Sequence, residues 1–148
     1  MSTPNKTLAS SRIHRTQGIL KFSRSTNVET TVFYGRGGLF QNSWIAPLQQ
    51  RKNSRHFLVM DRNIEKIYGS KVLAFLKQNG LKVKEVVIAP GERSKSLSVY
   101  KRLISSIATS GVDRDSYILA LGGGVVNNIA GFFASTLYRG IGLIQIPT

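Results

Sequence analysis

A run of three glycines is the clearest chemical signal in this chain. Gly122-Gly123-Gly124 directly follows an apolar run at residues 117–121 and directly precedes a second apolar stretch. Three glycines let the backbone approach a ligand closely and point successive N–H groups at one anion. A helix beginning there adds its positive end to the same place. The pattern favours a pyrophosphate site, and a tight strand-to-helix turn without a ligand is the structural alternative.

This loop matches neither of the common nucleotide fingerprints. It lacks the Lys-Ser/Thr pair of a Walker loop and the later glycine of G-x-G-x-x-G. Asp61, however, follows another apolar run, and a carboxylate at a strand end can accept bonds from both ribose hydroxyls. The alternative for Asp61 is an N-cap of the helix that follows.

The elements that must position these residues alternate along the chain. Apolar runs bounded by turn residues predict strands, and three- and four-residue apolar spacing predicts helices between them. Such alternation indicates an α/β fold, with a parallel sheet and helices on its faces. We expect strands at 31–34, 56–60, 83–88, 117–121 and 141–146, and helices at 39–50, 64–78, 96–110 and 126–137.

Composition narrows the functional classes. The chain has 148 residues, no cysteine, and 21 Lys and Arg against 7 Asp and Glu, a formal charge of +14. No stretch approaches the ~20 apolar residues of a membrane helix. The positive charge suits a polyanion, a phosphorylated small molecule, or an acidic partner region. Nucleic acid is disfavoured because no nucleic-acid motif is present and aromatic residues do not interleave with the basic ones.

The first 29 residues differ from the rest. No acid precedes Glu29, while basic residues are scattered among Ser and Thr. We interpret residues 1–29 as a basic, disordered leader and residues 30–148 as the folded domain. An organelle transit peptide is the alternative. The expected location is cytoplasmic, or a plastid or other organelle if the leader is a transit peptide.

Several motifs together resemble a known family, the 3-dehydroquinate synthases. The resemblance covers Thr30 to the last residue. The sequences of the motifs are most similar to those of the synthase domain of the fungal multifunctional shikimate-pathway protein. The motifs that support it, in order, are Val59-Met60-Asp61-Arg62-Asn63, Pro90-Gly91-Glu92-Arg93-Ser94-Lys95-Ser96, Leu119 to Val126, Ala130-Gly131-Phe132, Ala134-Ser135-Thr136, Tyr138-Arg139-Gly140 and Ile144 to Thr148.

The resemblance implies a Rossmann-like NAD-binding domain, normally followed by a helical domain that holds zinc or cobalt. Such an enzyme converts a seven-carbon sugar phosphate (DAHP) to 3-dehydroquinate with loss of phosphate, in the shikimate pathway of aromatic amino acid biosynthesis, and is usually a homodimer. Neither His14 nor His56 can form the family's metal site. We therefore expect no catalytic or metal-binding residue in this chain, and no activity from it alone.

The resemblance also implies roles for individual residues. Arg139 would hold the substrate phosphate, where a guanidinium can bind in two-pronged fashion. For Glu92 and Lys95 the alternative is a solvated ion pair in a turn. The residues that would bind NAD are Asp61 and Asn63 at the adenosine, Glu92 and Lys95, Gly123, Gly124 and Val125 at the pyrophosphate, Asn128 towards the nicotinamide, and Thr148.

One departure from the family pattern affects function. Asn127-Asn128 stands where the family typically has Gly-Asp. Asn128 keeps the size of the aspartate but loses its charge, and 2-deoxy-scyllo-inosose synthase, a related cyclase, also has Asn there. The activity of that cyclase is the alternative, although the sequences around Phe132 and Gln145 favour the synthesis of dehydroquinate. A non-catalytic, nucleotide-binding pseudoenzyme is the third interpretation.

Overall fold

The computed structural model describes residues 17–23, 29–35 and 37–148. These fall into two compact units, one ending at Gly38 and the other spanning Leu39–Thr148. The expected transit or leader residues 1–16 lie outside the described residues. None of the helices described is long and apolar enough to cross a membrane.

The first unit contains an antiparallel strand pair. Strand β1 (Gln17–Ser23) pairs with β2 (Glu29–Gly35), with Ile19 opposite Phe33. The basic composition of residues 1–29 predicts that β1 lies in a disordered leader and β2 in the folded domain. In the structure the two strands instead form one unit, because β1 supplies the backbone partners that the β-branched and aromatic run of β2 needs.

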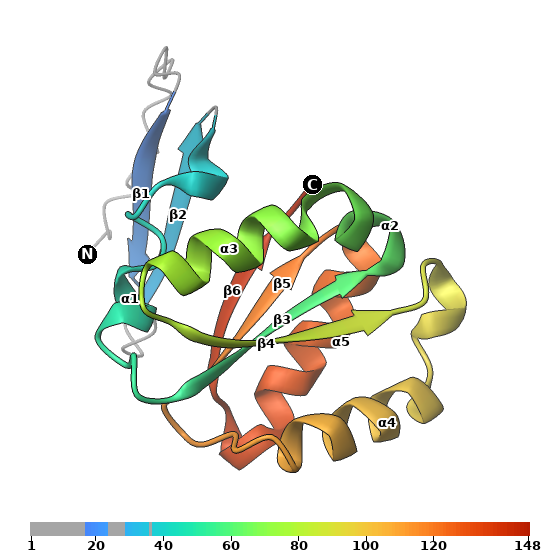
Figure 1. Ribbon diagram of the computed structural model, residues 1–148. Helices are drawn as coiled ribbons and strands as arrows, with labels where there is room; N and C mark the ends of the chain where they lie inside the picture. The colour runs from blue at the N-terminus through green and yellow to red at the C-terminus, as the bar shows by residue number, and fades with distance from the viewer. Residues whose placement is uncertain (1–16, 24–28, 36) are drawn as a thin grey trace, which may run out of the picture. The chain divides into compact units, whose positions relative to one another are not determined.

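The second unit is built on a parallel sheet, as expected. Its four strands lie in the order β4-β3-β5-β6, all parallel. The central pair is β3 (Arg55–Asp61) and β5 (Tyr117–Leu121), while β4 (Lys82–Ile88) and β6 (Gly142–Ile146) flank them. The chain moves outward from β3 to β4, then crosses back to β5 and β6, so the strand order reverses beside β3 (Figure 1).

Side chains of alternate residues on the inner strands pack into separate hydrophobic cores on the two faces of the sheet. Phe57 and Val59 pack with α4 (Leu97–Ala108) and α5 (Gly124–Thr136). Leu58 and Met60 pack with α3 (Ser70–Gln78) and Trp44 on the other face. This explains why β3 reads as an unbroken apolar run, since both of its faces are covered. Figure 1 shows α3 on one face and α4 and α5 on the opposite one.

The helices follow the expected spacing with two differences. The expected helix at 64–78 is divided into α2 (Arg62–Ile64), a π segment at Glu65–Gly69, and α3 (Ser70–Gln78). The expected helix at 39–50 is reduced to a 3₁₀ turn at Gly38–Phe40 and α1 (Ala46–Gln49), because Pro47 favours a helix start there. The remaining helices are α4 (Leu97–Ala108) and α5 (Gly124–Thr136), followed by a 3₁₀ turn at Leu137–Arg139.

Candidate nucleotide-binding site

The expected nucleotide-binding residues follow the carboxyl ends of neighbouring strands. Asp61 ends β3, the glycine loop follows β5, and Thr148 follows β6. Glu92 and Lys95 follow β4. Because all four strands are parallel, these ends form one edge of the sheet. Open α/β sheets bind ligands at that edge, near the point where the strand order reverses.

The glycine loop is fixed at its start and open at its end. Gly122 has φ +153°, its N–H donates to Ile146 O at 3.1 Å, and a Cβ there would lie 2.8 Å from Val126 Cγ2. Only glycine fits this position. Gly123 and Gly124 are exposed, and a Cβ on either would meet nothing within 4 Å.

Helix α5 begins in this loop without a cap. Gly123 is its N-cap residue and has no side chain to accept a hydrogen bond from the N–H groups of the first turn. Within the described part of the chain, the N–H groups of Gly123 and Gly124 have no acceptor. Unpaired donors at the positive end of a helix are a suitable environment for phosphate oxygens.

Asp61 caps the amino terminus of α2. Its Oδ1 accepts from the N–H of Asn63 at 2.8 Å and of Ile64 at 3.1 Å. This is the N-cap alternative raised by the sequence, and it uses only one carboxylate oxygen. No hydrogen bond to Oδ2 is found in the described residues, so Oδ2 is available to a ribose hydroxyl.

Glu92 and Lys95 pair with each other. The Lys95 Nζ lies 2.9 Å from Glu92 Oε2, the ion pair anticipated as an alternative to ligand binding. The turn that holds them depends on Ser94, whose buried hydroxyl donates to Ala89 O at 2.6 Å, and on Gly91 with φ +93°. Ser94 was missed by the sequence analysis, since a serine in a turn is usually exposed.

A hollow of about 290 Å³ lies between the start of α4 and the second and third turns of α5. This is near the lower end of the ~300–1,000 Å³ typical of small-ligand sites. It brings together Lys95 and Asn128, which are far apart in the chain. The other lining residues, not predicted from the sequence, are Ser96, Leu97, Tyr100, Ile129 and Phe132, with the Tyr100 and Phe132 rings 4.8 Å apart.

Arg139 is not brought to this site. It follows α5, whose 13 residues run from the glycine loop to the opposite edge of the sheet. At ~1.5 Å per residue the two ends of α5 are roughly 18 Å apart. Tyr138 and Arg139 have positive φ values of 49° and 69°, and Gly140 has 114°. Such consecutive outliers are uncommon and can mark a functional constraint.

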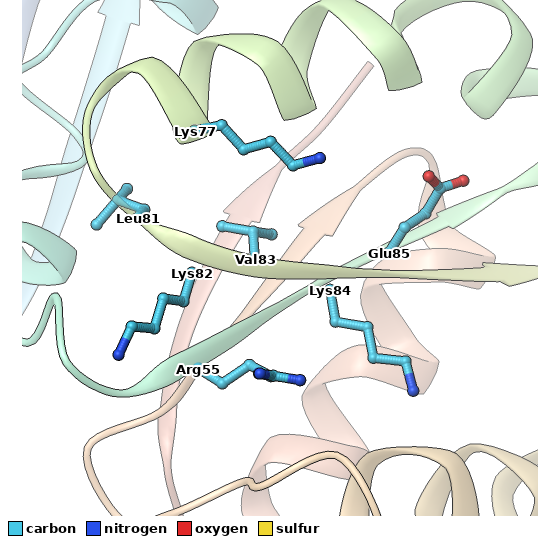
Figure 2. A pocket seen from close by; sticks show the side chains of 7 residues that line it. All are labelled: Arg55, Lys77, Leu81, Lys82, Val83, Lys84 and Glu85. Atoms are coloured by element: carbon cyan, nitrogen blue, oxygen red, sulfur yellow. The ribbon is translucent and has the colours of Figure 1, made fainter.

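A larger hollow, about 560 Å³, lies along the amino-terminal half of β4 (Figure 2). Lys82 and Lys84 point to the opposite side of the strand from Val83 and Glu85. Lys82 donates to Asn53 O and Lys84 to Ser106 O, so each ammonium group already has a partner within the protein. Lysines on an edge strand discourage pairing with another chain, and we do not assign this hollow to a ligand.

Metal ligands do not converge in the described ranges 17–23, 29–35 and 37–148, where no three His, Asp or Glu side chains form a group. His56 is fully buried, and its Nδ1 accepts from the N–H of Tyr117 at 3.1 Å. Burial lowers the pKa of His56 below its ordinary value. The imidazole is therefore a neutral core group, far from the carboxyl edge.

Comparison with known proteins agrees with this geometry. Residues 85–148 match the family model described as 3-dehydroquinate synthase N-terminal. The 3-dehydroquinate synthase of Symbiobacterium thermophilum is 40% identical over 117 residues, covering 79% of this chain and 33% of that protein. The synthase of Caldanaerobacter subterraneus is 45% identical over 97 residues, covering 66% and 27%. The resemblance read from the motifs is confirmed, and the chain spans a third or less of these two relatives.

Solved structures place the fold among sugar-phosphate cyclases. A 2-deoxy-scyllo-inosose synthase complexed with carbaglucose-6-phosphate, NAD⁺ and Co²⁺ gives a TM-score of 0.63 at 26% identity, covering 72% of this chain and 29% of that one. A 2-epi-5-epi-valiolone synthase from Streptomyces hygroscopicus, with NAD⁺ and Zn²⁺ bound, gives 0.60 at 28%, covering 68% and 28%. The expected Rossmann-like α/β fold is thereby confirmed.

Proposed function

We propose that this chain is the NAD-binding part of a sugar-phosphate cyclase of the 3-dehydroquinate synthase type. The observation that supports it most directly is the uncapped, exposed glycine loop at the carboxyl edge of the sheet. Its free N–H groups and the start of α5 suit a pyrophosphate. The two cyclase structures named above, both with NAD⁺ bound, share this fold.

Each predicted residue has a place in this proposal. Gly123, Gly124 and Val125 would bind the pyrophosphate through their backbone N–H groups. The free Oδ2 of Asp61 would accept from the adenosine ribose, with Asn63 beside it. Lys95 would exchange its bond to Glu92 for one to the cofactor, and Asn128 and Thr148 would face the nicotinamide end.

For the complete protein we propose the conversion of a seven-carbon sugar phosphate to 3-dehydroquinate, with elimination of phosphate. Bound NAD would supply transient oxidation and re-reduction of one substrate hydroxyl. Zinc or cobalt would be held by residues other than the described ones, which offer no ligand group. This chain's residues would bind and orient the dinucleotide, and we expect no turnover from the chain alone.

A homodimer is part of the same proposal. Arg139 lies at the far end of α5 from the glycine loop, roughly 18 Å along the helix, which places it away from a phosphate held at the loop of its own molecule. If Arg139 binds the substrate phosphate beside NAD, a second copy must contribute it. Cross-linking of the complete protein, with substitution of Arg139 in one copy only, tests this arrangement.

A cyclase acting on a six-carbon sugar phosphate is the second candidate. Asn128 lines the hollow beside Lys95, where it offers a neutral amide in place of the usual carboxylate. A site with one fewer negative charge would bind a different substrate hydroxyl pattern. Assays of the unaltered complete protein with the seven-carbon and the six-carbon sugar phosphate distinguish the two. If the six-carbon substrate is the true one, Asn128→Asp should impair its turnover.

Isothermal titration of the 148-residue chain with NAD tests the binding proposal. We expect saturable one-to-one binding that ADP-ribose also gives, because the pyrophosphate supplies the main contact. Phosphate release from the seven-carbon substrate by the complete protein, with NAD and Zn²⁺ or Co²⁺, tests the activity. Absence of saturable NAD binding to the folded chain would count against the proposal.

A further inference from the structure

The side chain of Asn127 makes two bonds that a glycine at this position could not make. Its side-chain Nδ2 donates to Gly122 O at 2.9 Å and to Gly123 O at 3.2 Å. Its backbone N–H donates to Gly123 O at 3.1 Å. One residue thus holds the carbonyl groups of two consecutive loop peptides.

Holding these carbonyls also orients the donors of the loop. The Gly122 carbonyl and the Gly123 N–H belong to one planar trans peptide and point in opposite directions. The same is true of the Gly123 carbonyl and the Gly124 N–H. By drawing both carbonyls towards the first turn of α5, Asn127 turns both N–H groups outward, to the exposed side of the loop.

The loop has few other restraints. Gly123 and Gly124 have no side chains, and even a Cβ added to either would meet no neighbour within 4 Å. The bond from the Gly122 N–H to Ile146 O holds only the beginning of the loop. Glycine has more backbone freedom to lose than any other residue. A donor set of this kind is preorganised only if something outside it fixes the peptide planes.

The orientation of the Asn127 amide is determined by its partners. Turning the amide over would place Oδ1 against two carbonyl oxygens, all of them acceptors. In the orientation found, Oδ1 is buried without a hydrogen-bond partner among the described residues. The amide nitrogen thus bonds to both loop carbonyls while the amide oxygen stays unpaired. A residue that only stabilised α5 would not need this arrangement.

We propose that Asn127 is a positioning residue that preorganises the Gly123 and Gly124 N–H groups for a pyrophosphate. The inference rests on the proposed nucleotide site but concerns a residue with no assigned role there. A glycine at this position would keep the backbone bond to Gly123 O but lose both side-chain bonds. The Gly122–Gly123 peptide would then be free and the Gly123–Gly124 peptide less restrained, so binding would have to order them at a cost in affinity.

Three variants of the 148-residue chain test the inference. Asn127→Ala removes the amide, and Asn127→Asp keeps the size while replacing both donors by carboxylate oxygens. The matched control is Asn79→Ala, because Asn79 Nδ2 makes a comparable bond to Phe75 O, at 2.9 Å, at the other edge of the sheet. Backbone order parameters of Gly123 and Gly124 are measured without ligand, and NAD affinity is measured by calorimetry.

We expect the order parameters of both glycines to fall in Asn127→Ala, from ~0.85 towards the ~0.6 of a flexible segment. NAD binding should weaken roughly fivefold, as for the loss of one net hydrogen bond. Asn127→Asp should weaken binding further, since its charge repels both the carbonyls and the pyrophosphate. It also serves if the alanine variant fails to fold. Asn79→Ala should lower Tm without changing either quantity.

Unchanged order parameters and affinity in the Asn127 variants would overturn the inference. So would a loss of Tm alone, matched by Asn79→Ala, because Asn127 would then only stabilise a helix. If the unaltered chain does not bind NAD, yet the Asn127 variants loosen the two glycines, the positioning role stands and the proposed function fails.

Discussion

Replacing Gly124 by alanine separates ligand binding from folding. Gly124 is the first residue of α5, and a Cβ there would meet nothing within 4 Å. The substitution therefore introduces no clash, and alanine costs less backbone entropy than glycine in a helix. We expect Gly124→Ala to raise the free energy of unfolding by about 0.5–1 kcal/mol, which corresponds to roughly 2–4 °C in Tm.

The same methyl group should damage the site. A Cβ in a helix leans towards its N-terminus, so at Gly124 it would lie where the pyrophosphate must approach the backbone. Losing one or two charge-assisted hydrogen bonds, at ~1.5–3 kcal/mol each, weakens binding by at least about tenfold. Calorimetric titration with NAD and thermal unfolding are both measured on the same variant.

Gly131→Ala is the matched control in the same helix. Its Cβ would make an ordinary contact with Leu143 Cδ2 at 3.8 Å, and Gly131 does not line the hollow. It should stabilise α5 by a similar amount and leave NAD affinity unchanged. Equal NAD affinity in Gly124→Ala and the unaltered chain would refute the claim that a ligand approaches the glycine backbone closely.

Three further substitutions probe other parts of the domain. Gly122→Ala should destabilise the fold by about 1–3 kcal/mol in urea unfolding, because its Cβ would lie 2.8 Å from Val126 Cγ2 at a φ of +153°; a loss under ~0.5 kcal/mol would contradict this. Because burial lowers the pKa of His56, the folded state resists protonation, so stability should be full above pH ~6.5 and fall as pH drops below it. In the His56→Asn variant the free energy of unfolding should no longer fall in this pH range. If it falls as it does in the unaltered chain, groups other than His56 cause the pH dependence. Lys95→Ala should weaken NAD binding with little change in Tm, since an exposed pair with Glu92 contributes only ~0–1 kcal/mol to stability; equal losses of both would make Lys95 a structural residue.

Much of the fold could be predicted because both faces of the inner strands are covered. The run at residues 57–60 is apolar at every position rather than at every second one, and this identifies a strand that is buried on both faces. The segment at 64–78 was less predictable. Its apolar spacing is helical throughout, but Gly69 packs against Met60, with a Cβ position only 3.4 Å from Met60 Cε, beside a π segment. That close approach depends on a contact between distant residues, which local spacing does not contain.

The pair β1–β2 was missed for a similar reason. Residues 17–23 are short of strong strand signals, and their pairing with 29–35 is a backbone property that side-chain patterns report weakly. The basic composition of the first 29 residues suggested a leader instead.

The position of the glycine loop was predictable because backbone geometry alone determines it. Glycines after a buried strand indicate a loop at the carboxyl edge, and the structure places them there. The roles of Asp61 and Glu92 were not predictable from the sequence, because a carboxylate serves equally as a cap, an ion-pair partner or a ligand contact. In the structure Asp61 caps α2 and Glu92 pairs with Lys95. The distance of Arg139 from the loop could not be predicted from the sequence either, because it depends on the direction in which α5 runs.

The most direct test of the central claim is an NMR titration of the 148-residue chain with NAD, following every backbone amide. The account predicts the largest shifts at the carboxyl edge of the sheet, at Gly123, Gly124 and Val125, with smaller ones at Asp61 and Asn128. No saturable shifts, or shifts concentrated at the β4 lysines beside the larger hollow and abolished by salt, would contradict it. The second pattern would identify the chain as a general binder of anions rather than a dinucleotide-binding domain.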